Sequence, residues 1–189
     1  MLEKGTFQYI NRRKKRTVLM ALGILLVAVL IFVVGLLLNK MSRANIFTVL
    51  AILCVLPWAK QVVALVVLFP YQSVSKERFD KVKKTLDSYP SEEVELMTDM
   101  VITSQDKVMQ LDFAVVGYGQ VIALVGKKGQ DIAYIRKYLT DGVHNWGDYK
   151  VKILDSEKLF LHEIEDIKVQ ETDQEEAANV KSYLHSLLV

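Results

Sequence analysis

The chain has 189 residues, 51% of them hydrophobic, and a formal net charge of +2 that hides an uneven distribution. Residues 1–73 hold nine Lys and Arg and one Glu, a net charge of +8, whereas residues 74–189 hold fifteen Lys and Arg and twenty-one Asp and Glu, a net charge of −6. An acidic part is poorly suited to neutralise phosphates, so the composition argues against a nonspecific nucleic-acid-binding protein.

Residues 17–39 form an apolar run without a charged side chain. As a helix, the stretch from Thr17 to Leu38 would measure roughly 33 Å, enough to cross a hydrocarbon layer about 30 Å thick. It is longer than the apolar core of a signal peptide and no small-residue cleavage site follows it, so we expect it to remain as a transmembrane helix. Residues 1–16 end in the basic block Arg12–Arg16, which by the positive-inside rule keeps the N-terminus in the cytoplasm.

A second apolar run, residues 46–70, follows after a short connection, so we expect an antiparallel hairpin of two transmembrane helices. Six basic residues precede the first run, two lie between the runs, and five follow within Lys76–Lys84. This distribution predicts a multi-pass protein of the cell membrane with its N-terminus and its C-terminal domain in the cytoplasm. The lone cysteine, Cys54, lies in the second run, so the C-terminal domain has no thiol chemistry.

Lys60 and Gln61 interrupt the second run close to Pro57. A central Lys costs roughly 2.5–3.5 kcal/mol on insertion, which the fifteen Leu, Ile, Val and Phe of the run offset at about 0.3–0.6 kcal/mol each. In one interpretation Lys60 extends toward the headgroups of membrane lipid, helped by a kink at Pro57. In the other, Lys60 and Gln61 contact another protein, which includes a second copy of this chain in a homo-oligomer.

Residues 75–189 have the composition of a small soluble α+β domain. Ser75–Tyr89 places apolar residues at helical spacing between charged ones, and Pro90 ends the predicted helix. Three runs rich in β-forming residues follow, at 96–103, 108–117 and 120–125. In the middle run we expect the apolar residues to share one face, opposite Gln110 and Asp112; they are Met109, Leu111, Phe113 and Val115.

The remaining sequence predicts two further helices and at least one strand. A helix follows Asp131 as its N-cap, with Gly142 just past its end. Residues 149–155 alternate as a strand, and residues 159–164 are compatible with another. The last helix opens with a capping box that begins at Thr172. The predicted order of the domain is therefore helix, three strands, helix, strand, with one further strand left open, and a final helix.

Common signatures of nucleotide and metal binding are incomplete in this sequence. Gly117-Tyr118-Gly119 lacks the third glycine of a dinucleotide fingerprint, and Gly126-Lys127-Lys128 lacks the upstream glycine and the Ser or Thr of a phosphate loop. The histidines do not have the spacing of a metal-binding pair. We interpret both glycine-containing segments as turns.

One arrangement of residues resembles a known family. The order helix-β-β-β-helix-β, with Gln110-x-Asp112, Gly119 and Val125-x-Lys127, resembles the nuclease-related NERD-type version of the restriction-endonuclease-like core over residues 76–155. That family has Gln-x-Asp on the second strand, a Gly at the hairpin and Glu-x-Lys on the third strand. The resemblance implies a restriction-endonuclease-like topology, with Asp112, Lys127 and Gln110 as the candidate catalytic residues.

Val125 stands where the resembled family has its metal-binding Glu. Metal-assisted cleavage of a phosphodiester needs two or more carboxylates on a hard cation, so the candidate metal ligands are Asp112 with Glu95 or Asp99 of the preceding strand. With Val125 in place of a carboxylate, we expect Asp112 to form at most an ion pair with Lys127.

The sequence therefore predicts a membrane-anchored cytosolic interaction or scaffold module without catalytic activity or cofactor. Its expected partners are membrane lipid and a protein whose identity the sequence does not indicate; nucleic acid is not an expected partner. The alternative is a membrane-tethered metal-dependent nuclease or related phosphodiester hydrolase, which would use a divalent metal.

Overall fold

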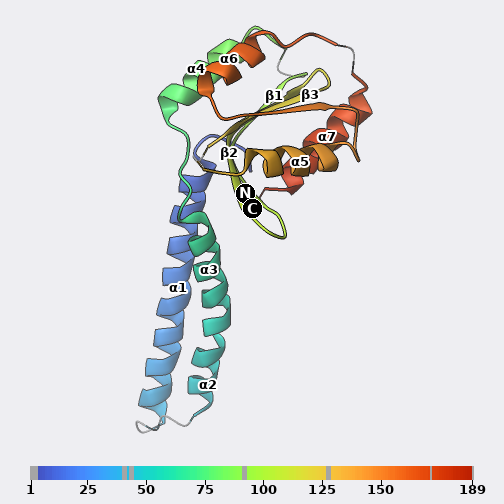
Figure 1. Cartoon of the computed structure of the whole chain (residues 1–189). Helices are drawn as coiled ribbons and strands as arrows, with labels where there is room; N and C mark the ends of the chain where they lie inside the picture. The colour runs from blue at the N-terminus through green and yellow to red at the C-terminus, as the bar shows by residue number, and fades with distance from the viewer. Residues whose placement is uncertain are drawn as a thin grey trace. The chain divides into compact units, whose positions relative to one another are not determined.

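The structure is a computed structural model that describes residues 4–39, 42, 45–90, 93–126, 129–170 and 172–188. It divides into two compact units, which we name by their residues. The hairpin unit is Ile10–Pro70, and the domain unit combines Met1–Tyr9 with Tyr71–Val189. Figure 1 shows helices α1, α2 and α3 of the first unit and the sheet with its helices in the second.

Two helical segments of the hairpin unit are long and apolar enough to cross a membrane. The first is helix α1, Tyr9–Leu38, which begins eight residues before the predicted run because the basic block continues the helix. The second consists of α2, Ile46–Leu53, and α3, Val55–Leu68. The helix is interrupted at Cys54, so that Pro57 lies in the first turn of α3, where its missing N–H leaves no helical hydrogen bond unmade.

The helices of the hairpin unit contact each other near the turn between them. At Gly35 an added Cβ would lie 2.4 Å from the Phe47 Cβ, so a side chain at this position would block the close approach of α1 and α2. The Asn45 side chain caps α2 by accepting a hydrogen bond from the Thr48 N–H at 2.9 Å. Asn39 and Asn45 each donate to the Gly35 carbonyl, at 2.9 and 3.3 Å, which satisfies polar groups at the turn.

A four-stranded sheet forms the centre of the domain unit. Its strands are β1, Glu95–Thr103; β2, Val108–Gly117; β3, Gln120–Val125; and β4, Lys150–Leu154. They lie in the order β1-β2-β3-β4, with antiparallel pairing of β1 to β2 and of β2 to β3, and parallel pairing of β3 to β4. The boundaries agree with the predicted strands to within a residue or two.

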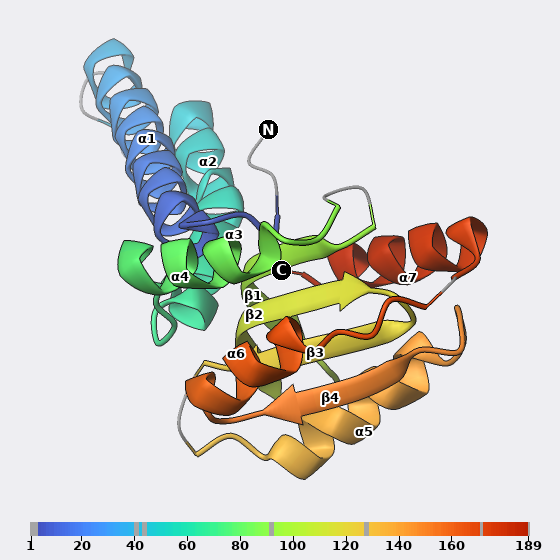
Figure 2. The same cartoon turned by 90° about the horizontal axis from the view of Figure 1, so that it is seen from above.

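Helices cover both faces of the sheet (Figure 2). Helices α4, Lys76–Leu86, and α6, Glu157–Glu165, lie on one face; α5, Ile132–Val143, and α7, Gln174–Ser186, lie on the other. Each helix pair closes its own buried apolar cluster against the sheet. Within the cluster beneath α4 and α6, the rings of Phe113 and Phe160 stack with centroids 5.9 Å apart.

Strand β2 changes its facing in the middle, contrary to the prediction that its apolar residues share one face. Met109 and Leu111 pack beneath α5 and α7, whereas Phe113 and Val115 pack beneath α4 and α6. The pairing of β2 with β3 shifts by one residue between Leu111 and Phe113. Asp112 is therefore the residue at which the strand irregularity lies.

Three local predictions in the C-terminal half were wrong. Residues 159–164 belong to helix α6 and not to a strand. Gly142 lies inside α5, where an added Cβ would come 1.8 Å from the Tyr183 hydroxyl of α7, so this glycine permits close packing of two helices. Helix α7 is capped by Asp173, whose carboxylate accepts from the Glu175 N–H at 2.9 Å, and not by Thr172. The predicted N-cap Asp131 of α5 was confirmed, and the structure also shows Ser75 as the N-cap of α4.

Residues 4–8, which we name the N-terminal strap, fold as part of the domain unit. The Gly5 carbonyl accepts a hydrogen bond from the Thr98 N–H of β1 at 2.7 Å, and Gly5 has a positive φ of 74° that favours glycine. The Phe7 ring stacks on Phe79 of α4 with centroids 4.5 Å apart. The segment before α1 is thus attached to the sheet edge, which the sequence did not predict.

Candidate functional site

Asp112 lies buried at the irregularity of β2. The neighbouring Gly126, just after β3, leaves space for its carboxylate: an added Cβ there would lie 2.0 Å from the Asp112 Oδ1 and 3.0 Å from the Gln110 Cδ. The glycine N–H donates to the Gln110 carbonyl at 3.1 Å. The Asp112 carboxylate therefore fits beside the backbone at Gly126 because this residue has no side chain.

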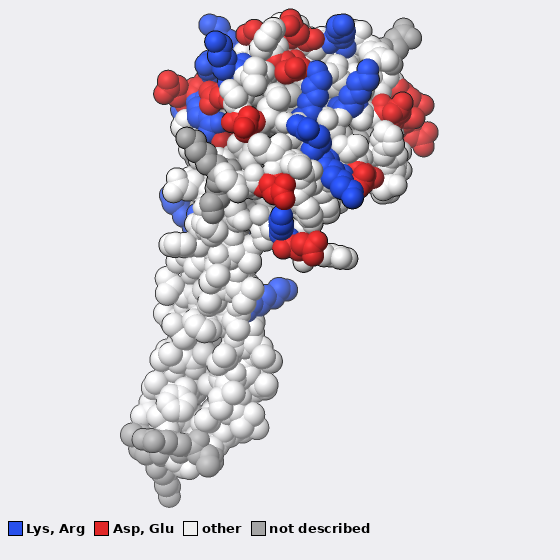
Figure 3. All heavy atoms as spheres, in the orientation of Figure 1, with Lys and Arg blue, Asp and Glu red and all other residues white. Residues whose placement is uncertain are grey.

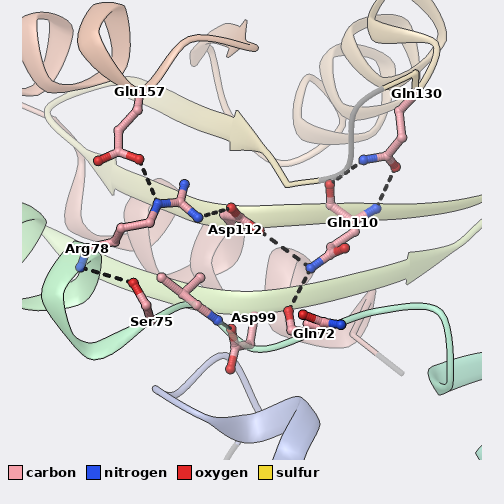
Figure 4. Close-up of polar contacts among 9 residues, drawn as sticks. Gln72, Ser75, Arg78, Asp99, Gln110, Asp112, Gln130 and Glu157 are labelled. Atoms are coloured by element: carbon pink, nitrogen blue, oxygen red, sulfur yellow. Dashed lines mark hydrogen bonds and ion pairs between the residues drawn. The ribbon is translucent and has the colours of Figure 1, made fainter.

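Arg78 of α4 neutralises the Asp112 carboxylate (Figure 4). Its Nη1 lies 2.6 Å from the Asp112 Oδ2, and its Nε lies 2.6 Å from the Glu157 Oε2 at the start of α6. The guanidinium centre is 5.6 Å from the ring centroid of Phe113. Burial opposes the charge on Arg78, but the hydrogen bonds to the two carboxylates outweigh it and raise the pKa of the guanidinium. One cation thus connects α4, β2 and α6.

Gln110 joins two loops to the same strand. Its side-chain Nε2 donates to the Gln72 carbonyl at 2.9 Å and to the Asp112 Oδ1 at 3.4 Å. Its backbone N–H and carbonyl both bond the side chain of Gln130, at 2.7 and 2.9 Å. These hydrogen bonds of Gln110 connect the segments before α4 and after β3 to β2, which is a structural role.

The structure brings some of the predicted metal ligands together and separates others. Asp99 of β1 lies opposite Asp112, because the residues on either side of the two are paired with each other across the strands. Asp99 has a positive φ of 54°, and its Oδ1 accepts a hydrogen bond from the Val74 N–H at 2.8 Å. Glu95 is paired with Val116 at the far end of β2, and its carboxylate lies 2.6 Å from the His185 Nε2. In the part of the chain that the structure describes, no group of three or more His, Cys, Asp and Glu could hold a metal ion.

The predicted partner of Asp112 was Lys127, which lies outside the described residues. The ion-pair partner that the structure shows is Arg78. A signal for it was present, because Arg78 precedes the buried Val82 and Leu86 by four and eight residues and so lies on the inward stripe of α4. Glu157 had no comparable signal, because the segment that begins α6 was compatible with a strand.

The polar pair of the second apolar segment lies on α3. Lys60 is exposed on this helix, and Gln61 is half-buried. On the face that Figure 3 shows, most of the surface of the hairpin unit is white, with few charged side chains. The sequence of the whole hairpin unit, residues 10–70, contains no Asp or Glu, so the unit supplies no carboxylate for Lys60.

The geometry around Asp112 is that of an ion-pair network. Two carboxylates converge on one guanidinium, which pairs with one oxygen of each and links α4 and α6 to β2. Comparison of the chain with protein families, with curated proteins and with solved structures gives no match. The functional argument therefore depends on the site itself.

Proposed function

We propose that this chain is a multi-pass membrane protein whose cytoplasmic domain serves as a non-catalytic interaction or scaffold module. The observation that carries the proposal is the bridge that Arg78 forms between Asp112 and Glu157. The guanidinium lies 2.6 Å from one oxygen of each carboxylate, and its positive charge would repel a hydrolytic metal ion bound beside them. Removing that cation to admit a metal would remove the ion pairs that join α4 to β2 and α6.

The membrane topology in this proposal is supported by the two chain segments that make up the domain unit. The strap before α1 and the chain after α3 belong to the same compact unit, so both ends of a membrane-spanning hairpin would emerge on one side. The six-two-five distribution of flanking basic residues favours the cytoplasm for that side.

The proposed fold relationship is to the restriction-endonuclease-like core. Its support is the element order α4-β1-β2-β3-α5-β4 and the parallel pairing of β3 with β4, together with Gln110 and Asp112 on β2. A membrane-tethered nuclease is the competing function, because Asp112 is buried beside two polar side chains in this arrangement.

A cleavage assay with purified full-length protein separates the two functions. With Mg²⁺ or Mn²⁺ added, we expect no chelator-sensitive cleavage of DNA or RNA, and we expect Asp112→Asn to lower thermal stability alone. An Asp112→Asn variant purified in parallel controls for contaminating nucleases, whose activity would survive the substitution. Chelator-sensitive cleavage that is present in the wild type and absent from the variant would overturn the proposal.

The interaction role needs its own test. Chemical crosslinking in native membranes, followed by mass spectrometry of peptides from residues 93–188, should detect crosslinks to another protein. Crosslinks confined to this chain would contradict an interaction module for other proteins.

A further inference from the structure

Lys60 lies on the exposed stripe of α3. The side chains of Leu56, Val63 and Val66, at helical spacing around it, are 70%, 62% and 64% exposed. In a membrane-spanning hairpin this stripe faces lipid or a neighbouring protein, so Lys60 projects into the hydrocarbon layer from an otherwise apolar surface. A charged side chain there requires a partner or a route to the interface.

The hairpin unit itself does not provide an anionic partner. Residues 10–70 hold eight Lys and Arg and no Asp or Glu. A second copy packed against the same stripe would therefore bring another ammonium group and no carboxylate, and the two like charges would repel each other. The counter-charge for Lys60 must come from outside the hairpin unit.

The depth of Lys60 favours the lipid surface at the basic end of α1. Lys14 Nζ donates to the Phe69 carbonyl at 3.0 Å, so the basic block and the end of α3 lie at one level. Lys60 precedes Phe69 by nine residues, about 13 Å along a helix. Its backbone is then closer to this surface than to the opposite one, in a hydrocarbon layer about 30 Å thick. The flexible side chain covers part of this distance by extending toward the headgroups, and local thinning of the bilayer covers the rest.

We infer that Lys60 binds the phosphate of an anionic phospholipid in the leaflet where α1 begins, with the basic block Arg12–Arg16 adding positive charge at the same surface. The inference rests on the proposed function, because it requires the hairpin unit to span the bilayer. The anionic headgroup supplies the charge that the hairpin lacks, and the lipid chain covers the exposed stripe of α3.

Lipid retention by full-length protein tests this inference. The wild type, Lys60→Leu, Lys60→Arg and Gln61→Leu are reconstituted in nanodiscs of phosphatidylcholine with added phosphatidylglycerol, purified, and analysed for bound lipid by mass spectrometry. We expect the wild type to enrich phosphatidylglycerol. Lys60→Leu should lower the apparent affinity about fivefold, the factor for losing one basic residue near the surface. Lys60→Arg keeps the charge and Gln61→Leu keeps Lys60, so both should retain the enrichment.

Two outcomes overturn the inference. Equal enrichment in the wild type and Lys60→Leu would show that the basic block alone attracts the lipid. A crosslinked dimer in the wild type that disappears in Lys60→Leu would show that Lys60 contacts a second copy. Carbonate extraction of the wild type distinguishes a failure of the proposed function, since a protein removed from membranes by carbonate does not span them.

Discussion

At the scale of single residues, Arg78 supplies the positive charge that pairs with the carboxylates of Asp112 and Glu157. Asp112 is buried, with its side chain 8% exposed, whereas Arg78 and Glu157 are each 33% exposed. Loss of the guanidinium would therefore leave one carboxylate buried without its cation and a second one nearby. The position of the buried group, and not the number of ion pairs, makes this bridge important for stability.

We predict that Arg78→Ala lowers the free energy of unfolding by about 1–3 kcal/mol, because it leaves a buried acceptor unsatisfied. Arg78→Lys should recover only part of the loss, since an ammonium group lacks the planar fork that reaches both carboxylates. Thermal or denaturant unfolding of the full-length protein measures the effect. Lys84→Ala, on the exposed side of the same helix, is the matched control, and equal stability of Arg78→Ala and this control would contradict the prediction.

A second residue-scale prediction concerns Asp131, the N-cap of α5. A hydrogen bond from Lys107 at 2.9 Å and another from the Tyr134 N–H lower the pKa of this carboxyl. A lowered folded-state pKa gives a stabilising contribution that is present above the ordinary value near 3.8 and is lost as the pH falls through the folded-state value. Asp131→Asn keeps a capping oxygen, so its stability should depend less on pH in this acidic range. An unchanged pH profile would contradict the assignment.

At the scale of elements, the local sequence pattern predicted the strands and most helices. The irregularity within β2 instead depends on pairing between strands. Strands β1 to β3 have β-rich runs bounded by turn residues, and these are properties of neighbouring residues. The apolar spacing at Phe160, Leu161 and Ile164 suits α6, but so short a segment is also compatible with a strand. The irregularity at Asp112 depends on the partner strands, which sequence periodicity does not show.

The same reasoning applies to the site. Asp112 and Gln110 were identified as candidates only through the resemblance of Gln110-x-Asp112 to a family motif. The connection of Asp112 to Arg78 spans 34 residues and that of Gly5 to Thr98 spans 93, so neither follows from local spacing. The irregular segments that complete the domain were therefore harder to predict than its strands.

The N-terminal strap offers a test at the element scale. Phe7→Ala removes the ring that stacks on Phe79, an interaction typically worth about 0.5–1.5 kcal/mol. If that pair holds the strap, amide hydrogen exchange at Thr98 should accelerate about two- to tenfold, because its N–H is bonded to the Gly5 carbonyl. Amides within β2 and β3 serve as the internal reference. Exchange at Thr98 that stays unchanged would show that the strap is held by other contacts.

At the scale of the whole molecule, charge divides along the same boundary as the two compact units. The hairpin unit has eight basic residues and no acidic ones, a net charge of +8, whereas the domain unit has sixteen basic and twenty-two acidic residues, a net charge of −6. An anionic leaflet attracts the basic block and repels an acidic domain. If the hairpin unit spans a membrane, as proposed, the domain unit is attached to it through the covalent connections to α1 and α3 and not through attraction of its acidic surface to the lipid.

The last prediction concerns the orientation of the hairpin. On a background with Cys54 replaced by Ala, a membrane-impermeant thiol reagent added to intact cells should label Ser42→Cys and spare Ser156→Cys. Ser42 lies between the two apolar segments and Ser156 lies just before α6 in the domain unit, so one position reports the side of the hairpin turn and the other the side of the domain unit. Permeabilised cells provide the control, in which both cysteines should react. Labelling of Ser156→Cys but not of Ser42→Cys in intact cells would show the opposite orientation of the hairpin. Labelling of both positions in intact cells would instead contradict a membrane-spanning hairpin, because the strap and the domain unit would then share one compartment with the turn.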